Sequence, residues 1–214
     1  MFIFRILFIF LTYIAGSIPF GSIISRKTAG IDITRKGSGN IGATNVAREI
    51  GIKWGLLTLL LDLLKGFFPV FIARNYISDV EGLFLISTSL AVLLGHRFSL
   101  FLKFRGGKGV ATAFGIFLVL SPLSTLISLC AFVAAVYFFD YISLGSIVAA
   151  CIMPLTLSIL NKPAALIITA FFTAVLILIT HSGNINRIIK GEERKWKKGN
   201  HGSTSSKRSN SSLE

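Results

Sequence analysis

Seven hydrophobic stretches separated by short polar segments dominate the pattern of this chain. A helix needs about 20 residues to cross about 30 Å of hydrocarbon, and most of the stretches approach that length. Backbone polar groups in lipid must be satisfied within each segment, so helix is the expected conformation. The pattern therefore predicts an all-α integral membrane protein, a helical bundle of about seven transmembrane helices. The stretches are residues 2–24, 52–73, 83–98, 109–121, 123–139, 141–160 and 163–181.

Two of these stretches leave alternatives open. The run 109–121 is short for a crossing, so it either spans where the bilayer is thin or enters beside protein and returns. The first stretch, in which Arg5 precedes an apolar run, is also typical of a signal peptide. The six hydrophobic stretches that follow it favour a retained membrane helix instead.

Composition agrees with lipid as the solvent of this chain. Of its 214 residues, 53% are hydrophobic and 14% are charged, and the mean hydropathy is +0.75, values outside the range of soluble domains. A net charge of +13 is also found in nucleic-acid-binding proteins, but 18 of the 22 Lys and Arg residues lie in segments 25–53, 97–108 and 182–214. Cytoplasmic loops are enriched in Lys and Arg, so these segments are expected on one side. We therefore expect no nucleic-acid partner, an outside N-terminus and a cytoplasmic C-terminus.

The first basic segment contains GSGNIGATNVAR, residues 37–48. Its glycines allow the backbone to approach a ligand closely, and Arg48 offers a fork suited to phosphate. Hydroxyl and amide groups are interleaved with the glycines, which a loop that only sets topology does not need. We therefore interpret the segment as a substrate site rather than a flexible loop. The polar side chains are those of Ser38, Asn40, Thr44 and Asn45.

The second basic segment reads KFRGGKGVAT, residues 103–112, directly before a hydrophobic stretch. Backbone amides of a glycine-rich turn at a helix N-terminus form an anion site, to which Arg105 and Lys108 add charge. The nucleotide-triphosphate type of loop is excluded, because Leu102 stands at the first glycine position and Gly109 follows the lysine. We expect a phosphate loop, with a simple basic turn as the alternative. Its predicted members are Arg105, Gly106, Gly107, Lys108 and Gly109.

The third segment reads THSGNINR, residues 180–187, at the end of the last hydrophobic stretch. His181 and Asn184 are three positions apart and share a face if the helix continues. Histidine is the side chain that acts as a base near neutral pH, and an asparagine orients a phosphate or a carbonyl. An interfacial histidine without a catalytic part is the alternative.

The sequence contains no motif for metal-dependent, redox or serine-nucleophile catalysis. Cys130 and Cys151 have no ligand-spaced neighbours, and no nucleophile elbow or His-Glu-x-x-His motif is present, so we expect neither a metal nor a cofactor. Asp62 and Lys65, three apart in a hydrophobic stretch, are expected to neutralise one another. The role of His96 stays open.

The end of the chain divides into two parts. Residues 184–198 place isoleucines on one helical face and Trp196 among lysines, which predicts an interfacial helix. From residue 199 onward the Ser, Asn, Gly and Lys composition predicts disorder. We thus expect one transmembrane domain over residues 1–190 and a basic, partly disordered cytoplasmic tail over 191–214.

The ordered motifs GSGNIGATN, LGHRF with FRGGKGVAT, and H-x-x-N-I resemble the acyl-phosphate-dependent glycerol-3-phosphate acyltransferases of bacteria, the PlsY family. The resemblance covers about residues 10–190. It implies a seven-helix bundle in the bacterial inner membrane with a cytoplasmic active site, acting in phospholipid biosynthesis. It also implies transfer of a fatty acyl group from acyl phosphate to the 1-hydroxyl of glycerol 3-phosphate, with membrane lipids around the protein and functional coupling to a soluble acyl-phosphate synthase.

Carried over position by position, the resemblance implies roles for residues of all three motifs. Ser38 and Arg48 match functional residues of the first motif, and residues 105–109 match the glycerol-phosphate loop. His181 and Asn184 match the third motif, with Ser182-Gly183 in place of the usual Arg-Glu. Other departures are Ile41 for proline and Ser99-Leu100 for a Pro-Val step.

Two rival functions fit parts of the pattern. A membrane transporter of a phosphorylated metabolite also places anion sites near helix ends, although the weak internal symmetry expected of such carriers is not visible. A scaffold that binds anionic lipid through basic loops predicts that Ser38 and Asn184 are dispensable. Acyl transfer by the purified protein separates all three.

Overall fold

The computed structural model describes residues 2–77 and 82–199, and every regular element in that part of the chain is a helix. The predicted all-α class is confirmed. The α-helices are α1 (Phe2–Ser17), α2 (Phe20–Ala29), α3 (Ala43–Ile50), α4 (Ile52–Ile72), α5 (Leu83–Arg97), α6 (Val110–Leu120), α7 (Pro122–Phe139), α8 (Ile142–Ile159), α9 (Ala164–Thr180), α10 (Ser182–Ile189) and α11 (Trp196–Gly199). Short turns of other helix types are η1 (Ile33–Arg35), η2 (Ala73–Ile77) and η3 (Leu100–Leu102).

Six of the predicted hydrophobic stretches each correspond to one main α-helix with ends close to those expected, and the first stretch, 2–24, is divided between α1 and α2. Five helical segments of the described chain are long and apolar enough to cross a membrane, and α9 with α10, bent by 59°, makes a sixth if counted as one span. Helix α6 has only 11 residues. The exact number of crossings stays a prediction. The five segments are Phe2–Ala29, Ile52–Ile77, Leu83–Leu102, Pro122–Phe139 and Ile142–Ile159.

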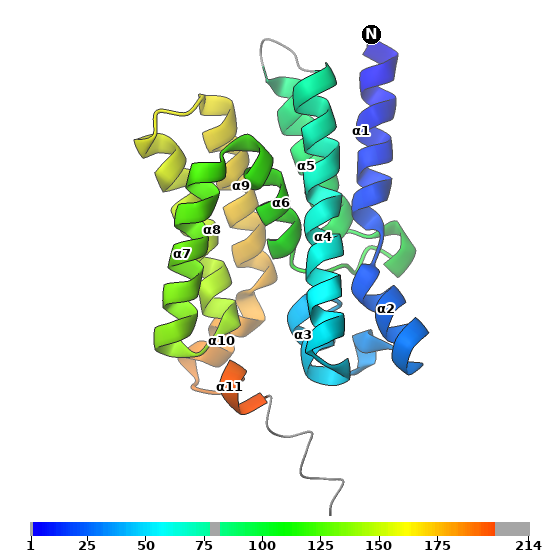
Figure 1. The fold of residues 1–214 in the computed structure, drawn as a ribbon, viewed down its shortest axis with the longest axis vertical. Coiled ribbons are helices and arrows are strands. Elements are labelled where there is room, and N and C mark those ends of the chain that lie inside the picture. The colour runs from blue at the N-terminus through cyan, green and yellow to red at the C-terminus, as the bar shows by residue number, and fades with distance from the viewer. Residues whose placement is uncertain (1, 78–81, 200–214) are drawn as a thin grey trace, which may run out of the picture.

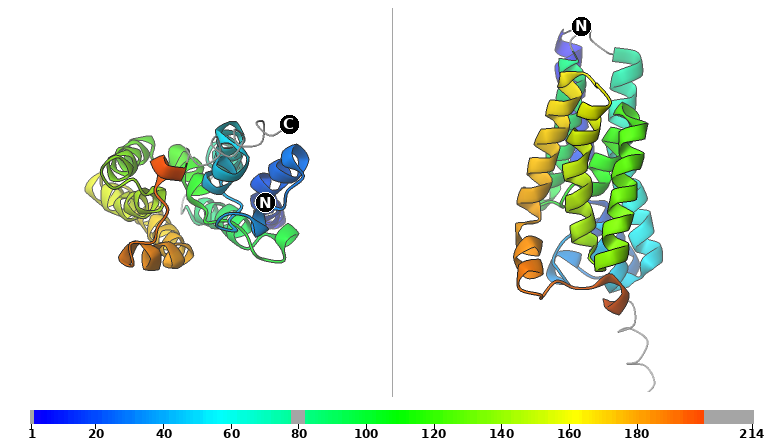
Figure 2. Two further views of the ribbon diagram at one scale, coloured as in Figure 1. Left: turned by 90° about the horizontal axis from the view of Figure 1, so that it is seen from below. Right: turned by 90° about the vertical axis from the view of Figure 1, so that its left-hand side faces the viewer.

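The long helices run side by side, and the short helices α2, α3, α10 and α11 gather at one end of the bundle (Figures 1 and 2). We call this the polar end. The N-terminal end of α1 lies at the opposite end (Figure 1). The two described ends of the chain thus lie at opposite ends of the bundle, as an odd number of crossings requires. Which end faces the cytoplasm stays a prediction.

The first stretch is broken into α1 and α2 at Ile18–Pro19, because proline has no N–H to continue the helix. A buried ion pair in α4 supports this break. The Lys65 Nζ donates to the Ile18 carbonyl over 2.8 Å and lies 2.8 Å from the Asp62 Oδ1. The expected mutual neutralisation of Asp62 and Lys65 is confirmed, and their side chains are only 3–4% exposed.

Helix α1 is packed into the bundle along α5. A side chain at Gly16 would stand 2.3 Å from the Val92 carbonyl oxygen, and one at Gly95 would stand 2.3 Å from that of Tyr13. Small residues at a crossing let helix backbones approach closely in a membrane. The packing favours the membrane-helix interpretation of the first stretch over a signal peptide.

The predicted single interfacial helix over residues 184–198 was wrong. Helix α10 ends at Ile189, and Gly191 turns the chain with a φ of +71° in the left-handed region, which suits glycine. The chain then crosses the polar end over residues 191–197, of which 192–195 have no regular structure and the last two begin α11 (Figure 2). We call this segment the strap. The predicted disorder of residues 200–214 lies outside the described residues.

Candidate active site

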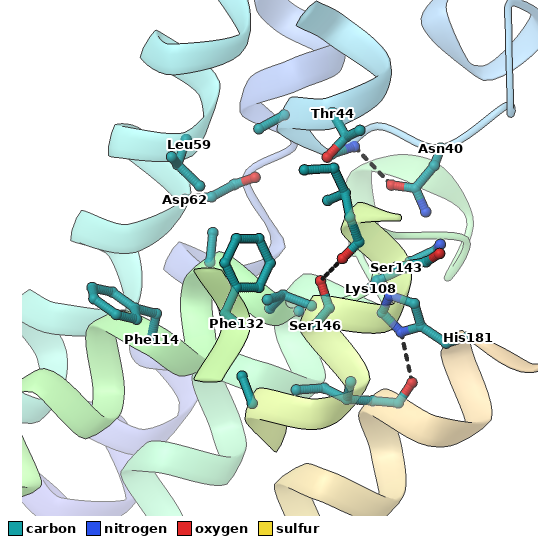
Figure 3. A pocket seen from close by; sticks show the side chains of 18 of the residues that line it. Asn40, Thr44, Leu59, Asp62, Lys108, Phe114, Phe132, Ser143, Ser146 and His181 are labelled. Atoms are coloured by element: carbon teal, nitrogen blue, oxygen red, sulfur yellow. Dashed lines mark hydrogen bonds between the residues drawn. The ribbon is translucent and has the colours of Figure 1, made fainter. Parts of the chain in front are cut away.

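A cavity of about 850 Å³ opens between α3, α4 and α6 on one side and α7, α8 and α9 on the other. Its polar end is lined by residues of all three predicted segments, and the remainder is lined mainly by apolar side chains. Figure 3 shows Lys108, Ser143 and His181 toward one end, with Leu59 and Phe114 toward the other. The structure therefore brings together motifs that lie far apart in the sequence.

The first segment forms a loop that Asn45 holds in shape. Its amide nitrogen donates to the carbonyls of Asn40 (2.9 Å) and Lys36 (3.0 Å), and its Oδ1 accepts from the Ser38 N–H at 3.0 Å. The side chain is 4% exposed. Because both ends of this amide are bonded to the loop, Asn45 shapes the site rather than presenting a free group to a substrate.

The remaining predicted residues of this segment line the cavity. Asn40 accepts the Gly42 N–H at 2.7 Å, a local turn that leads into α3 (Figure 3). Ser38, Thr44 and Arg48, which carry hydroxyl and guanidinium groups, line the cavity. These three side chains are the part of the segment that is suited to bind a substrate.

The second segment is fixed against the end of α5. The Gly106 N–H donates to the Arg97 carbonyl at 2.8 Å, and the Gly107 N–H donates to the His96 carbonyl at 3.1 Å. A Cβ at position 107 would stand 2.2 Å from the His96 Nε2. The predicted use of these two amides for phosphate needs correction, because both are already bonded to α5.

Arg105 also departs from the prediction. Its side chain is exposed and does not line the cavity. Lys108 and Gly109, in contrast, do line the cavity, at the start of α6. The N–H groups in the first turn of a helix have no intrahelical partner, so this end of α6 adds positive potential beside Lys108.

His96, whose role was open, belongs to the support of this loop. It is 3% exposed, and its Nδ1 lies 3.3 Å from the Thr112 Oγ1 and 3.8 Å from the Asp62 Oδ1. Asp62 itself is tied to Lys65. A buried polar cluster in the body of the bundle thus holds the loop that carries Lys108.

The third segment meets the second one directly. The Lys108 ammonium donates to the Asn184 Oδ1. His181, 2% exposed, stands at the bend between α9 and α10, with its Nδ1 2.8 Å from the Ile177 carbonyl (Figure 3). Because a carbonyl only accepts, Nδ1 carries the proton, and Nε2 is the free acceptor of the neutral ring.

Comparison with known proteins agrees with this geometry. A family model described as glycerol-3-phosphate acyltransferase matches residues 6–191. The chain belongs to the glycerol-3-phosphate acyltransferase family. The resemblance noted in the sequence is therefore confirmed.

Relatives in this family match along nearly their whole length. A glycerol-3-phosphate acyltransferase of Desulfotalea psychrophila is 47% identical over 194 residues, covering 90% of this chain and 98% of the relative. That of Geotalea daltonii is 44% identical over 186 residues, covering 87% and 94%.

Two solved structures of the family share the fold. The crystal structure of PlsY (YgiH), an integral membrane glycerol 3-phosphate acyltransferase, in its glycerol 3-phosphate form is 38% identical with a TM-score of 0.85, covering 90% of this chain and 95% of that one. Its lysophosphatidic acid form is also 38% identical, with a TM-score of 0.83 and coverage of 89% and 94%. This chain is accordingly an integral membrane protein, as its apolar helices indicate.

Glu193, Ser143 and Ser146 of the candidate site were missed by the sequence argument. The Glu193 carboxylate accepts hydrogen bonds from the Ser143 hydroxyl (2.6 Å), the Asn184 amide (2.6 Å) and the Arg187 Nε (2.8 Å). Glu193 looked like part of a solvated charged tail. Ser143 lies in a hydrophobic stretch, where its spacing of three from Ser146 was the available signal, and both serines line the cavity.

The polar end of the acyltransferase cavity perturbs the pKa of its titratable groups. Burial lowers the pKa of Lys108 to about 8, against the opposing effect of Glu193. Burial and the nearby Lys108 charge lower the pKa of His181 to about 4. Burial alone raises the pKa of Glu193, but hydrogen bonds from Ser143, Asn184 and Arg187 hold it below its ordinary value. At neutral pH the site therefore holds a neutral imidazole beside a charged lysine and a charged carboxylate.

With Lys108 as the expected partner of the substrate phosphate, binding of glycerol 3-phosphate is expected to weaken as pH rises through about 8, where the lysine loses its proton. Radioligand binding between about pH 7, where the phosphate is mostly dianionic, and about pH 10 measures this. Lys108→Arg is the control, since a guanidinium stays charged throughout. An equal slope in both proteins would show that Lys108 ionisation is not the cause.

Proposed function

We propose that this protein transfers a fatty acyl group from acyl phosphate to the 1-hydroxyl of sn-glycerol 3-phosphate, releasing 1-acyl-sn-glycerol 3-phosphate and phosphate. One observation carries the proposal. A single cavity combines a cationic, amide-rich end with a long apolar part. This combination suits a donor that has both a phosphate and an acyl chain, placed beside a small phosphorylated acceptor.

Lys108 and Asn184 are the proposed acceptor site. Their side chains are bonded to each other at the polar end, and the start of α6 lies next to them. An ammonium group with a helix N-terminus attracts a phosphate. An amide nitrogen carries two N–H groups, and that of Asn184 donates to Glu193 with one of them, which leaves the second suited to a hydroxyl group of the acceptor. Glu193 holds the Asn184 amide through a hydrogen bond and thus orients it.

Ser38, Thr44 and Arg48 are the proposed donor site. Arg48 is suited to bind the phosphate of the donor through two parallel hydrogen bonds, and the hydroxyls are suited to the phosphate or the carbonyl. The acyl chain then extends along the apolar wall. That wall is formed by side chains such as Leu59, Phe114, Phe117, Phe132 and Met153.

The proposed reaction needs no covalent enzyme intermediate, because acyl phosphate is already an activated anhydride. The acceptor hydroxyl oxygen forms a bond to the acyl carbon, the bond from that carbon to the phosphate oxygen breaks, and phosphate leaves with the electron pair. The protein contributes by positioning two anions and by neutralising the charge that develops between them. Cations and amides, rather than a nucleophile, are the groups that such a reaction requires.

The proton of the acceptor hydroxyl goes to the departing phosphate in this proposal. The neutral His181 offers its Nε2 as a hydrogen-bond acceptor that orients the hydroxyl. The departing phosphate carries the electron pair of the broken bond and is a stronger base than the imidazole, whose pKa burial and Lys108 lower to about 4. His181 then directs the attack without holding the proton at the end of the step.

His181→Gln is expected to lower kcat by about 10- to 100-fold, because the glutamine retains volume but loses the rigid acceptor. In the variant, log kcat plotted against pH is expected to keep the wild-type shape, since the phosphate and not the imidazole takes the proton. Steady-state kinetics at saturating substrates measure both. Undiminished turnover would show that His181 has no part in the mechanism. If the variant instead lost the decrease in kcat on one side of the pH profile, His181 would be the group that takes the proton.

The basic residues at the polar end support a cytoplasmic location of the site in a bacterial inner membrane, by the enrichment of Lys and Arg in cytoplasmic loops. This location would make the site accessible to a soluble acyl-phosphate synthase and to glycerol 3-phosphate. The acyl chain of the product would leave into the surrounding lipid.

The test is acyl transfer by the purified protein from radiolabelled acyl phosphate or acyl-CoA to glycerol 3-phosphate. We expect labelled product with acyl phosphate and at most a trace with acyl-CoA. Transfer from acyl-CoA alone would contradict the proposed donor. Absence of product with both donors, together with movement of labelled glycerol 3-phosphate across vesicles, would favour a transporter.

A further inference from the structure

The strap is bonded to both sides of the cavity at the polar end. On one side, the Glu193 carboxylate accepts hydrogen bonds from Ser143 and Asn184. On the same side, the backbone N–H of Trp196 donates to the carbonyl of Asp140, which follows α7, over 2.9 Å. On the other side, the strap meets α3 through Arg48. Seen from the polar end, α11 lies between the two groups of helices (Figure 2).

Arg48 has two contacts with the strap. One of its terminal nitrogens donates to the Arg194 carbonyl at 3.2 Å, and the centre of the guanidinium lies 5.9 Å from the centroid of the Trp196 ring. A cation within about 6 Å of an indole face is attracted by the ring. Arg48 and Trp196 both line the cavity, so this contact forms part of its wall.

We infer that Trp196 is a positioning residue, which holds the Arg48 guanidinium toward the phosphate of the acyl donor. The inference rests on the proposed function. The Arg48 Nε is buried and has no hydrogen-bond partner among the described residues, so the strap satisfies only part of the guanidinium. Trp196 lies beyond residues 6–191, which the family model matches.

The geometry explains why a long side chain benefits from such a support. An arginine loses rotamer freedom when it binds a phosphate, and a group that is already held loses less. The carbonyl of Arg194 and the indole face restrict the guanidinium from two directions. The acceptor site is not held in this way by Trp196, because Glu193 and Lys108 bond Asn184 directly.

Steady-state kinetics with acyl phosphate test the inference. Trp196→Ala is expected to raise the KM for acyl phosphate about fivefold, the size of a cation–π contact, and to leave the KM for glycerol 3-phosphate within about twofold. Trp196→Phe, which retains an aromatic face, is expected to restore most of the donor KM. Lys197→Ala is the matched control, because that side chain lies over Tyr137 and not over Arg48.

A double-mutant cycle identifies Arg48 as the partner. In an Arg48→Lys background, Trp196→Ala is expected to change the donor KM by less than about twofold, because the planar group that stacks is already gone. Fully additive effects would overturn the inference. Equal rises in both KM values with a lowered Tm would also overturn it, because they would indicate a structural role only.

Fluorescence tests the contact without turnover. The chain has two tryptophans, so Trp54→Phe leaves Trp196 as the single indole. Adding Arg48→Gln to that protein is expected to increase acrylamide quenching of Trp196, whereas Arg26→Gln is expected to leave it unchanged. Unchanged quenching with Arg48→Gln would overturn the inference. An inactive wild type would instead refute the proposed function, and an active wild type with an unaffected Trp196→Ala would refute the inference alone.

Discussion

Replacing Lys108 with methionine is expected to lower kcat/KM for acyl transfer by about 100- to 1,000-fold, the cost of removing a preorganised charged donor from an active site. Lys108 is the cation of the second segment that lines the cavity, and its ammonium is bonded to Asn184. Methionine keeps the length of the side chain, so the packing around α6 is retained. The acceptor phosphate loses its charge partner in the variant.

Lys103→Met is the matched control for this substitution, because Lys103 belongs to the same basic turn but is exposed. We expect its kcat/KM to stay within about threefold of the wild type, as for an exposed charge. Equal losses in the two variants would mean that the basic turn acts only through general charge. Unchanged activity of Lys108→Met would remove the proposed acceptor site.

Glu193→Ala is expected to lower both stability and activity. The substitution leaves Ser143, Asn184 and Arg187 without the carboxylate that accepts from all three. Breaking a buried pair costs about 3–5 kcal/mol, but Arg187 is 42% exposed, so we expect about 2 kcal/mol here. The loss of an oriented Asn184 is expected to lower kcat/KM by about 30-fold. Thermal unfolding in detergent and steady-state kinetics measure the two effects.

The neighbouring Glu192 supplies the control, because its side chain is exposed. Glu192→Ala is expected to keep the wild-type Tm and activity. A pH titration gives a second check. The pKa of Glu193 is lowered in the folded protein, so its contribution to stability is present above the ordinary glutamate pKa and is lost as pH falls through the folded value. A Glu193→Ala protein with wild-type stability at neutral pH would contradict this account of the strap.

The fold was predictable from sequence where one physical requirement dominates. The length of apolar sequence needed to cross lipid fixed the helices, so the expected stretch 123–139 and the observed Pro122–Phe139 differ by one residue. The break at Ile18–Pro19 and the 59° bend after α9 were not predicted. In both places the hydrophobic pattern continues while the backbone changes direction. The prediction used only the length and hydrophobicity of each stretch, which carry no information about the direction of the helix.

The sequence predicted which residues line the candidate site better than it predicted the hydrogen bonds that those residues make. Lys108, His181, Arg48 and Ser38 do meet at one cavity. The glycine amides of the second segment were misassigned, because the carbonyls of His96 and Arg97 that bond to them belong to the preceding helix. Such backbone pairing leaves no local signature in side-chain type. Arg105 was included because it is basic and because it matches the glycerol-phosphate loop by resemblance, and neither tells which way a loop residue faces.

Glu193 shows a second limit of the sequence argument. A glutamate in a run of charged residues near a chain end is usually solvated, and nothing nearby marks it as buried. Its partners, Ser143 and Asn184, lie 50 and 9 positions away. Only the path of the strap back across the polar end brings them together.

The central claim is that one cavity holds the donor phosphate and the acceptor phosphate at the same time. Binding of radiolabelled glycerol 3-phosphate to purified protein saturated with a non-hydrolysable acyl phosphonate tests it most directly. We predict that the acceptor binds the saturated protein with an affinity at least equal to that for the free protein. Displacement of glycerol 3-phosphate by the phosphonate would reveal a single phosphate site and contradict the claim.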